Sequence, residues 1–247
     1  MSKSKPIRHL NYPLVIVLIL FNAFNAGCRG AHHDSSTIAQ DSAPDEEFYN
    51  VLQYKGPLTV KVDRKIGHID RTGKVIVKPQ FDDAERFSEG LARVCLGKCE
   101  RYAAHNKADE SKWGFIDEKG QYIVNPQYSS AGDFSEGLAA VCAGDCGFLS
   151  AGSHAWGFID KLGNVVIPLQ FGNANFFHEG LAAACVGSCV YGKSEGKWGF
   201  IDKTGKFIIN PQFDEVQFFA GGIAEASVAE KSGWIDKAGK FVWNPSN

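Results

Sequence analysis

One nine-residue segment recurs along this chain with little change, and this recurrence constrains the fold more than any other feature. Residues 112–120 read Lys-Trp-Gly-Phe-Ile-Asp-Glu-Lys-Gly, and residues 155–163 and 197–205 repeat that pattern. Two weaker copies, without the first tryptophan, lie at residues 66–73 and 232–239. Self-similarity at a regular spacing indicates a repeat architecture. It also argues against an enzyme, because an active site is usually one asymmetric constellation.

Each repeat contains the signals of three short β-strands. A short apolar run follows Glu-Gly or Gly-Gly, as at residues 91–94. The Trp-Gly-Phe-Ile-Asp segment is aromatic and β-branched, which favours a strand. A turn ending in glycine then leads into an apolar return strand, as at residues 206–209. Because proline cannot donate to a β-ladder, we expect the return strands to end at the prolines that follow. These are Pro79, Pro126, Pro168, Pro211 and Pro245.

The chain therefore divides into a leader, a tether and an all-β repeat domain. We assign residues 1–27 to a signal peptide, 28–47 to a lipidated cysteine with a flexible tether, and 48–247 to the repeats. The repeat domain is predicted to contain five three-stranded antiparallel units, at residues 48–80, 81–127, 128–170, 171–212 and 213–247. We expect an open or superhelical array, and a closed, propeller-like ring is the alternative.

The Trp-Gly pairs are expected to form the shared core of the array. A three-stranded unit cannot bury its own apolar face, so stacked neighbours must share one core. A buried tryptophan removes a large apolar area from water, and the adjacent glycine lets another backbone approach closely. The predicted core positions are Trp113, Gly114, Trp156, Gly157, Trp198, Gly199 and Trp234.

Lys-Trp-Gly-Phe-Ile-Asp-x-x-Gly, followed by an apolar strand and Pro-Gln-Phe/Tyr, resembles the bacterial WG-repeat (KWG) family. The resemblance covers roughly residues 48–247, with three close copies and degenerate first and last copies. It departs from the family pattern at Ile66 and Ser232, which replace tryptophan, and atypical terminal repeats are expected as caps. The resemblance implies tandem β units, often in exported proteins, with no established catalytic activity or cofactor.

The N-terminus carries the features of an export signal. Three basic residues precede an apolar run at residues 13–24, which is short for a membrane span of about 20 residues. The following Asn25-Ala26-Gly27-Cys28 resembles a bacterial lipobox, although Asn25 departs from its usual pattern. We expect lipidation of Cys28 and an outer-membrane lipoprotein. An ordinary secretory signal with an incidental Cys28, and an uncleaved anchor, are the alternatives.

Six further cysteines form three Cys-x-x-x-Cys pairs at the same place in the middle three units. We predict local disulfides that clamp the long loops preceding the Trp-Gly motif, because exported proteins favour such bonds. Bridges between units, metal binding with His105 or His154, and redox catalysis are the rival interpretations. The pairs are Cys95/Cys99, Cys142/Cys146 and Cys185/Cys189.

Other polar residues recur in ways that indicate structural duties. Asp117, Asp160 and Asp202 are expected to accept hydrogen bonds from their own turns, with a row of calcium ligands as the alternative. Glu89, Glu136 and Glu179 repeat, which suggests turn or cap duty. We interpret His68 and His178 as sequence drift rather than chemistry.

The functional prediction is an exported, lipid-anchored, non-catalytic protein that binds or scaffolds an envelope protein or glycan. The contact would be made by the clamped loops, at residues 100–112, 147–155 and 190–197. A purely structural envelope protein and a glycan-acting enzyme are the alternatives. No catalytic residue, metal or cofactor is assigned. The formal net charge is −2 and the sequence has no block of basic residues, so it does not predict binding to nucleic acid.

Overall fold

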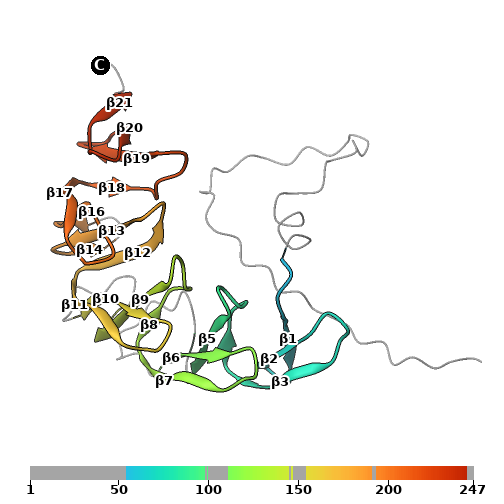
Figure 1. The fold of residues 1–247 in the computed structure, drawn as a ribbon. Helices are drawn as coiled ribbons and strands as arrows, with labels where there is room; N and C mark the ends of the chain where they lie inside the picture. Colours follow the sequence, from blue (N-terminus) through green and yellow to red (C-terminus); the bar gives the residue numbers. More distant parts are fainter. Residues whose placement is uncertain are drawn as a thin grey trace, which may run out of the picture.

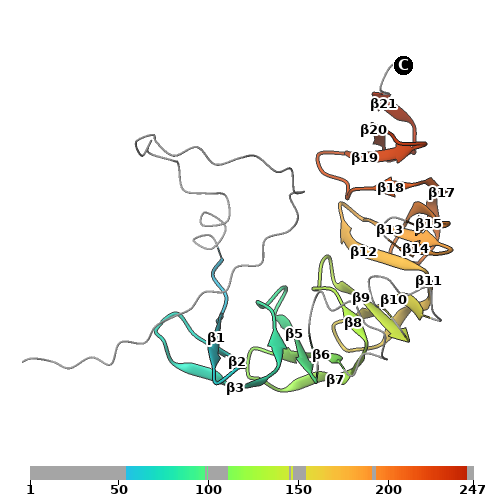
Figure 2. The same cartoon turned by 180° about the vertical axis from the view of Figure 1, so that it is seen from behind.

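The chain is described by a computed structural model for residues 54–97, 99, 111–144, 146, 154–190 and 193–243. Within these ranges the secondary structure is all β, and no helix is long and apolar enough to cross a membrane. Five antiparallel sheets follow one another along a curved array (Figures 1 and 2). The first and last sheets lie at opposite ends of the curve. The all-β prediction and the open arrangement are therefore confirmed, and the described sheets do not close into a ring.

The sheets are built from strands of four kinds, which we call leading, inner, motif and return strands in chain order. The leading strands are β4 (Asp83–Ala84), β8 (Ser130–Ala131), β12 (Asn173–His178) and β18 (Glu215–Val216). The inner strands are β1 (Leu58–Val62), β5 (Leu91–Leu96), β9 (Leu138–Gly144), β13 (Leu181–Val186) and β19 (Ile223–Val228). The motif strands, which carry the recurrent segment, are β2 (Lys65–Ile69), β6 (Lys112–Asp117), β10 (His154–Asp160), β16 (Lys197–Ile201) and β20 (Lys231–Asp236). The return strands are β3 (Val75–Phe81), β7 (Tyr122–Tyr128), β11 (Val165–Phe171), β17 (Phe207–Phe213) and β21 (Phe241–Trp243).

Sheet 1 has the three predicted strands, and sheets 2 to 5 each add a fourth to them. The fourth is the leading strand, which pairs with the free edge of the inner strand, as Asp83 does with Cys95. Three of the four leading strands are only two residues long, and two residues are too few to produce a strand pattern in a sequence. Sheet 4 also carries a small hairpin of β14 (Cys189–Val190) and β15 (Lys193–Ser194) in its long loop.

The first four return strands run through the prolines that were expected to end them, which corrects that expectation, and Pro245 lies outside the described residues. Strand β3 runs through Pro79 to Phe81, and its pairing with β2 shifts between the Ile66–Phe81 and His68–Val77 pairs. Proline is tolerated here because the return strand is the edge of its sheet and bulges at that point. The bulge packs over the motif glycine: a Cβ on Gly67 would lie 2.6 Å from the Pro79 nitrogen.

The hydrophobic core lies between successive sheets, in four clusters that correspond to the four interfaces. At the interfaces after sheets 2, 3 and 4, the motif-strand phenylalanine packs against an aromatic ring that follows the next leading strand or lies near its end. The ring centroids are 4.7–4.9 Å apart in the pairs Phe115–Phe134, Phe158–Phe177 and Phe200–Phe219. Each of these motif-strand rings is fully buried. The array is thus held together by contacts between neighbours, as expected of a repeat protein.

Candidate functional site

Disulfides close the base of the long loop in each of the three middle sheets. Cys95 is bonded to Cys99 with a Cα–Cα distance of 6.2 Å. The other two bridges, Cys142–Cys146 and Cys185–Cys189, each span 6.3 Å between Cα atoms. The first cysteine of each pair is fully buried on an inner strand. The bridges are local, and each lies where its inner strand leaves the sheet.

Each of these three disulfides lies directly across the sheet from a tryptophan. The register pairs Cys95 with Trp113, and the same pairing recurs for Cys142 with Trp156 and for Cys185 with Trp198. In sheet 5, serines occupy both places. Sequence reasoning missed this coupling, although tryptophan and the cysteine pair occur together in the same three repeats.

The tryptophans differ in how far they enter the core: Trp113 belongs to a buried cluster, Trp156 and Trp198 pack against theirs, and Trp234 is largely exposed. Trp113 is buried, Trp156 and Trp198 are half-buried, and Trp234 is 42% exposed. The centre of each interface between sheets 2 and 5 is filled by the phenylalanine two places after the motif tryptophan. The tryptophan lies toward the loop end of the sheet, where fewer neighbouring atoms cover it. The motif glycines are buried as expected, because the return strand packs onto them.

The recurrent aspartates organise the turn between motif and return strands. One carboxylate oxygen of Asp160 accepts hydrogen bonds from the amides of Leu162 and Asn164, at 2.9 and 2.8 Å. Asp117 and Asp202 make the equivalent pair of bonds. The side-chain hydrogen bond from Asn164, followed by those two amides, lowers the pKa of Asp160 below its ordinary value. The carboxylates are therefore occupied by their own turns.

A hairpin tip carries a glutamate that joins one sheet to the next. Glu89 has a φ of 52°, and Gly90 follows it in the two-residue turn between Ser88 and Leu91. The Glu89 carboxylate accepts a hydrogen bond from the Gly137 amide at 3.0 Å, and Lys161 pairs with it at 3.0 Å. Sheet 2 is thereby joined to sheet 3. The turn duty predicted for the glutamates is present, and the contact between sheets is added to it.

The same contact recurs at the next two interfaces. Glu136 pairs with Lys203 at 3.2 Å, and Glu179 pairs with Lys237 at 3.1 Å. The Lys237 ammonium, followed by the Gly222 amide, lowers the pKa of Glu179 below its ordinary value. In sheet 5 the glutamate position is glycine, at Gly221. We name this set of glutamate contacts the sheet clip.

The residue before each clip glutamate adds a hydrogen bond between sheets. Ser88 donates from its hydroxyl to the carbonyl of Phe134 at 2.7 Å, and Ser135 donates in the same way to Phe177 at 2.6 Å. His178 takes the serine position, and its Nδ1 lies 2.6 Å from the carbonyl oxygen of Phe219. The histidine therefore preserves the contact, which gives it a structural role in place of the serine.

His68 is also a structural substitution, at the place of the motif phenylalanine. Its ring is fully buried and lies edge-on to Phe87, with 4.8 Å between centroids. Nε2 lies 2.9 Å from the carbonyl oxygen of Glu85, to which it donates, whereas Nδ1 has no partner among the described atoms. Burial lowers the pKa of His68 from 6.5 to about 4. The imidazole is neutral at physiological pH and fills the ring position of the first interface.

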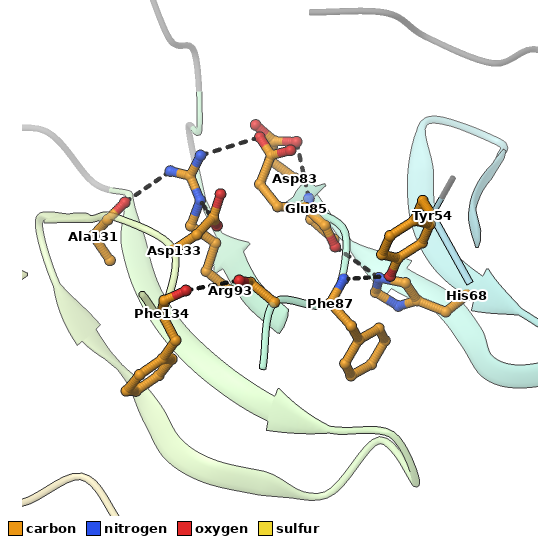
Figure 3. Close-up of polar contacts among 11 residues, drawn as sticks. Tyr54, His68, Asp83, Glu85, Phe87, Arg93, Ala131, Asp133 and Phe134 are labelled. Atoms are coloured by element: carbon orange, nitrogen blue, oxygen red, sulfur yellow. Dashed lines mark hydrogen bonds and ion pairs between the residues drawn. The ribbon is translucent and has the colours of Figure 1, made fainter. Parts of the chain in front are cut away.

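Arg93 makes a polar contact between sheets 2 and 3 that no other interface repeats among the described residues. Figure 3 shows its guanidinium between the two sheets. It donates to Asp133 and to the carbonyl of Ala131, each at 2.7 Å, and lies 3.3 Å from Glu85. Its Cζ is 5.1 Å from the centroid of the Trp113 ring. All of its contacts are to residues of the fold, so we assign it a structural role.

An exposed aromatic cluster lies on sheets 4 and 5. Phe176 and Phe218 are 41% and 43% exposed, with ring centroids 5.3 Å apart. The ring of His178 lies beside both, at 6.4 and 5.2 Å. The corresponding places in sheets 2 and 3 hold Arg86 and Asp133. The cluster belongs only to the C-terminal part of the array.

Several predicted sites lie outside the described residues. Cys28, the tether, the histidine His105 and most of the three loops are among them. Within the ranges that the structure does describe, no three His, Cys, Asp or Glu side chains are grouped so that they could hold a metal ion. The described residues therefore include three loops closed at their base by disulfides, polar contacts between sheets and one exposed aromatic cluster.

Comparison with known proteins identifies the class of this repeat. The family model for the WG containing repeat matches residues 66–98, 113–145, 156–188 and 198–231. The chain belongs to this family, which confirms the resemblance seen in the sequence. No curated protein matches the chain.

A solved structure of a protein of unknown function from Bacteroides caccae is similar over 76% of this chain and 77% of that chain. The two are 15% identical, with a TM-score of 0.32.

Proposed function

We propose that this protein is a non-catalytic binding or scaffolding module, exported and held at the outer membrane by a lipid on Cys28. Its partner is an envelope protein or glycan, which it contacts through the long loops of sheets 2 to 4. The observation that supports this proposal is the recurrence of a disulfide at the base of each long loop. A covalent clamp restricts a loop before it binds, which lowers the entropic cost of recognition. Intrachain disulfides also agree with export.

Sheets 1 and 5 are an internal control for this proposal, because they form without a long loop. In sheets 1 and 5 the inner and motif strands are joined by two-residue turns, Asp63-Arg64 and Ala229-Glu230. All four turn residues have positive φ, between 48° and 66°. The sheets therefore form with or without the long loop, so the loops are not needed to connect the strands.

The test replaces the long loops by the short turn. Residues 97–111, 144–154 and 187–196 are each exchanged for Ala-Glu, and the remaining buried cysteine of each pair becomes serine, as at Ser227. Circular dichroism should report the same β-sheet spectrum. Parent and variants are immobilised and exposed to envelope extract and to a glycan panel. We expect the parent to retain a partner that the triple variant loses.

Three results would contradict the proposal. Identical capture by parent and triple variant would place any binding elsewhere on the array. Capture by neither would favour the structural alternative. Release of a shortened glycan by the parent would instead reveal an enzyme. The lipid is tested separately, by mass spectrometry of the native N-terminus, where an unmodified Cys28 would exclude the anchor.

A further inference from the structure

A glutamine recurs on the return strands of sheets 1 to 4, directly before the aromatic residue that ends each strand. The four residues are Gln80, Gln127, Gln170 and Gln212, and each is exposed. No hydrogen bond joins their side chains to other residues in the described ranges. The recurrent turn aspartates and clip glutamates, by contrast, are hydrogen-bonded within the fold. The repetition of the glutamine is therefore not explained by contacts that stabilise the array.

The glutamines lie on the same strands as a row of exposed aliphatic residues. Each return strand is an edge of its sheet, and Figures 1 and 2 show β3, β7, β11 and β17 along the outer side of the curve. Where the pairing with the motif strand shifts, one return-strand residue is left out of the ladder. In sheets 2 to 5 it is isoleucine or valine and is 38–57% exposed. The four residues are Ile123, Val166, Ile208 and Val242.

The exposed positions two places before and after these aliphatic residues hold no carboxylate. Sheets 1, 4 and 5 carry exposed lysines there, at Lys74, Lys78, Lys206 and Lys240. The turn aspartates lie near three of these lysines, and their oxygens are hydrogen-bonded by amides of the turn. Glu118 adds one further carboxylate, in the turn of sheet 2. The strands themselves therefore present ammonium and amide donors, which complement the oxygen atoms of a ligand.

A polymer of sugars fits this combination of groups. A side-chain amide both donates and accepts hydrogen bonds, as sugar hydroxyls do, and lysine donates to hydroxyl and carboxylate oxygens. The aliphatic side chains contact the C–H faces of sugar rings. Packed sheets are on the order of 10 Å apart, close to the length of a disaccharide in an extended chain. A repeating surface thus meets a repeating ligand, and weak contacts accumulate along it.

We propose that an extended polysaccharide binds along the return strands, on the outer side of the array. This surface lies outside the long loops, so the inference does not depend on the loop-mediated contact proposed above. A lipid surface is the less suitable occupant, because a protein lying on a membrane needs a continuous apolar face with a basic border. Here, single aliphatic residues are separated by amides.

The test measures binding to polysaccharides of known composition. The full chain is immobilised on a sensor surface and washed free of detergent. Dextran, polygalacturonate, alginate or vesicles with anionic lipid are then passed over it. The parent is compared with Gln127→Ala/Gln170→Ala and with the variant that changes all four glutamines to alanine. The matched control is Lys61→Ala/Gln217→Ala, which removes two exposed polar side chains from other strands and loops.

We expect the parent and the control to bind polysaccharide equally, and the acidic polymers at least as tightly as dextran. The double glutamine variant should bind about tenfold more weakly, and the fourfold variant at least about thirtyfold more weakly, because hydrogen bonds to the polymer are lost. The variant in which the three long loops are exchanged for Ala-Glu should bind like the parent. Circular dichroism should show that all variants keep the β-sheet spectrum.

Four outcomes would overturn the inference. A parent that captures none of the polysaccharides has no such surface. Equal binding by the parent and the fourfold glutamine variant would exclude the return strands. Loss of polysaccharide in the loop-exchanged variant would place the sugar on the loops, in agreement with the function proposed above but not with this inference. Capture of the vesicles alone would assign the surface to a membrane.

Discussion

The buried His68 makes the first interface sensitive to acid, and replacing it with phenylalanine should remove that sensitivity. The three following motif strands hold Phe115, Phe158 and Phe200 at this place, each fully buried, so the fold accommodates a phenyl ring there. The change His68→Phe also removes the one ring nitrogen that lacks a partner among the described atoms. It should leave the stability at pH 7.5 close to that of the parent.

The size of the effect follows from the pKa of His68. Burial lowers it from 6.5 to about 4, so between these values the unfolded chain binds a proton that the folded chain excludes. The free energy of unfolding therefore falls as the pH falls from 6.5 towards 4, and it is fully retained above 6.5. The shift predicts a loss of about 2–3 kcal/mol at pH 4.5 relative to pH 7.5.

Urea unfolding at the two pH values, followed by circular dichroism, measures this loss. Other groups titrate in both proteins, so the informative quantity is the difference between parent and variant. We expect the parent to lose about 2–3 kcal/mol more than His68→Phe on acidification. Equal losses in the two proteins would refute the reasoning, and would mean that His68 becomes protonated in the folded state.

Three further predictions concern the core, the disulfides and the sheet clip. The substitution Phe158→Ala should destabilise the array by about 3–5 kcal/mol in urea unfolding, because a fully buried ring is lost; an unchanged midpoint would show that the ring is not part of the core. Replacing Cys142 and Cys146 together with serine should lower the free energy of unfolding by about 2 kcal/mol at most, since the closed loop is short; a larger loss would show that the bridge stabilises the protein by more than the closure entropy of this loop. Glu136→Gln should cost no more than about 1 kcal/mol, and less in high salt, as expected for a partly exposed ion pair; a cost that is independent of salt would contradict the role of its charge.

The repeat pattern was sufficient to predict the class of fold. The recurrent Trp-Gly-Phe-Ile-Asp segment, the glycine turn and the return strand are local signals, and each appears in the structure, with four of the return strands longer than predicted. The turn aspartates and the local disulfide pairs could also be predicted, because both depend on residues within about five positions of each other. Asp160 and its turn amides are an example.

Contacts between sheets could not be predicted in this way. The phenylalanine, rather than the tryptophan, lies at the centre of the interface because the next sheet brings Phe177 onto Phe158. The two-residue leading strands form only because an inner-strand edge is already present. The roles of the two histidines, which looked like drift, depend on carbonyl groups of other repeats.

The sequence by itself determined the repeating unit of this protein, because its strands and turns are specified by neighbouring residues. Only the tertiary structure decided which side chains are buried and which faces remain open, since each sheet is completed by residues of the next. That dependence ends at sheet 5, where no further sheet follows in the described chain. Trp234 and Trp243 are exposed there, whereas the residues at the same places in the earlier sheets are buried.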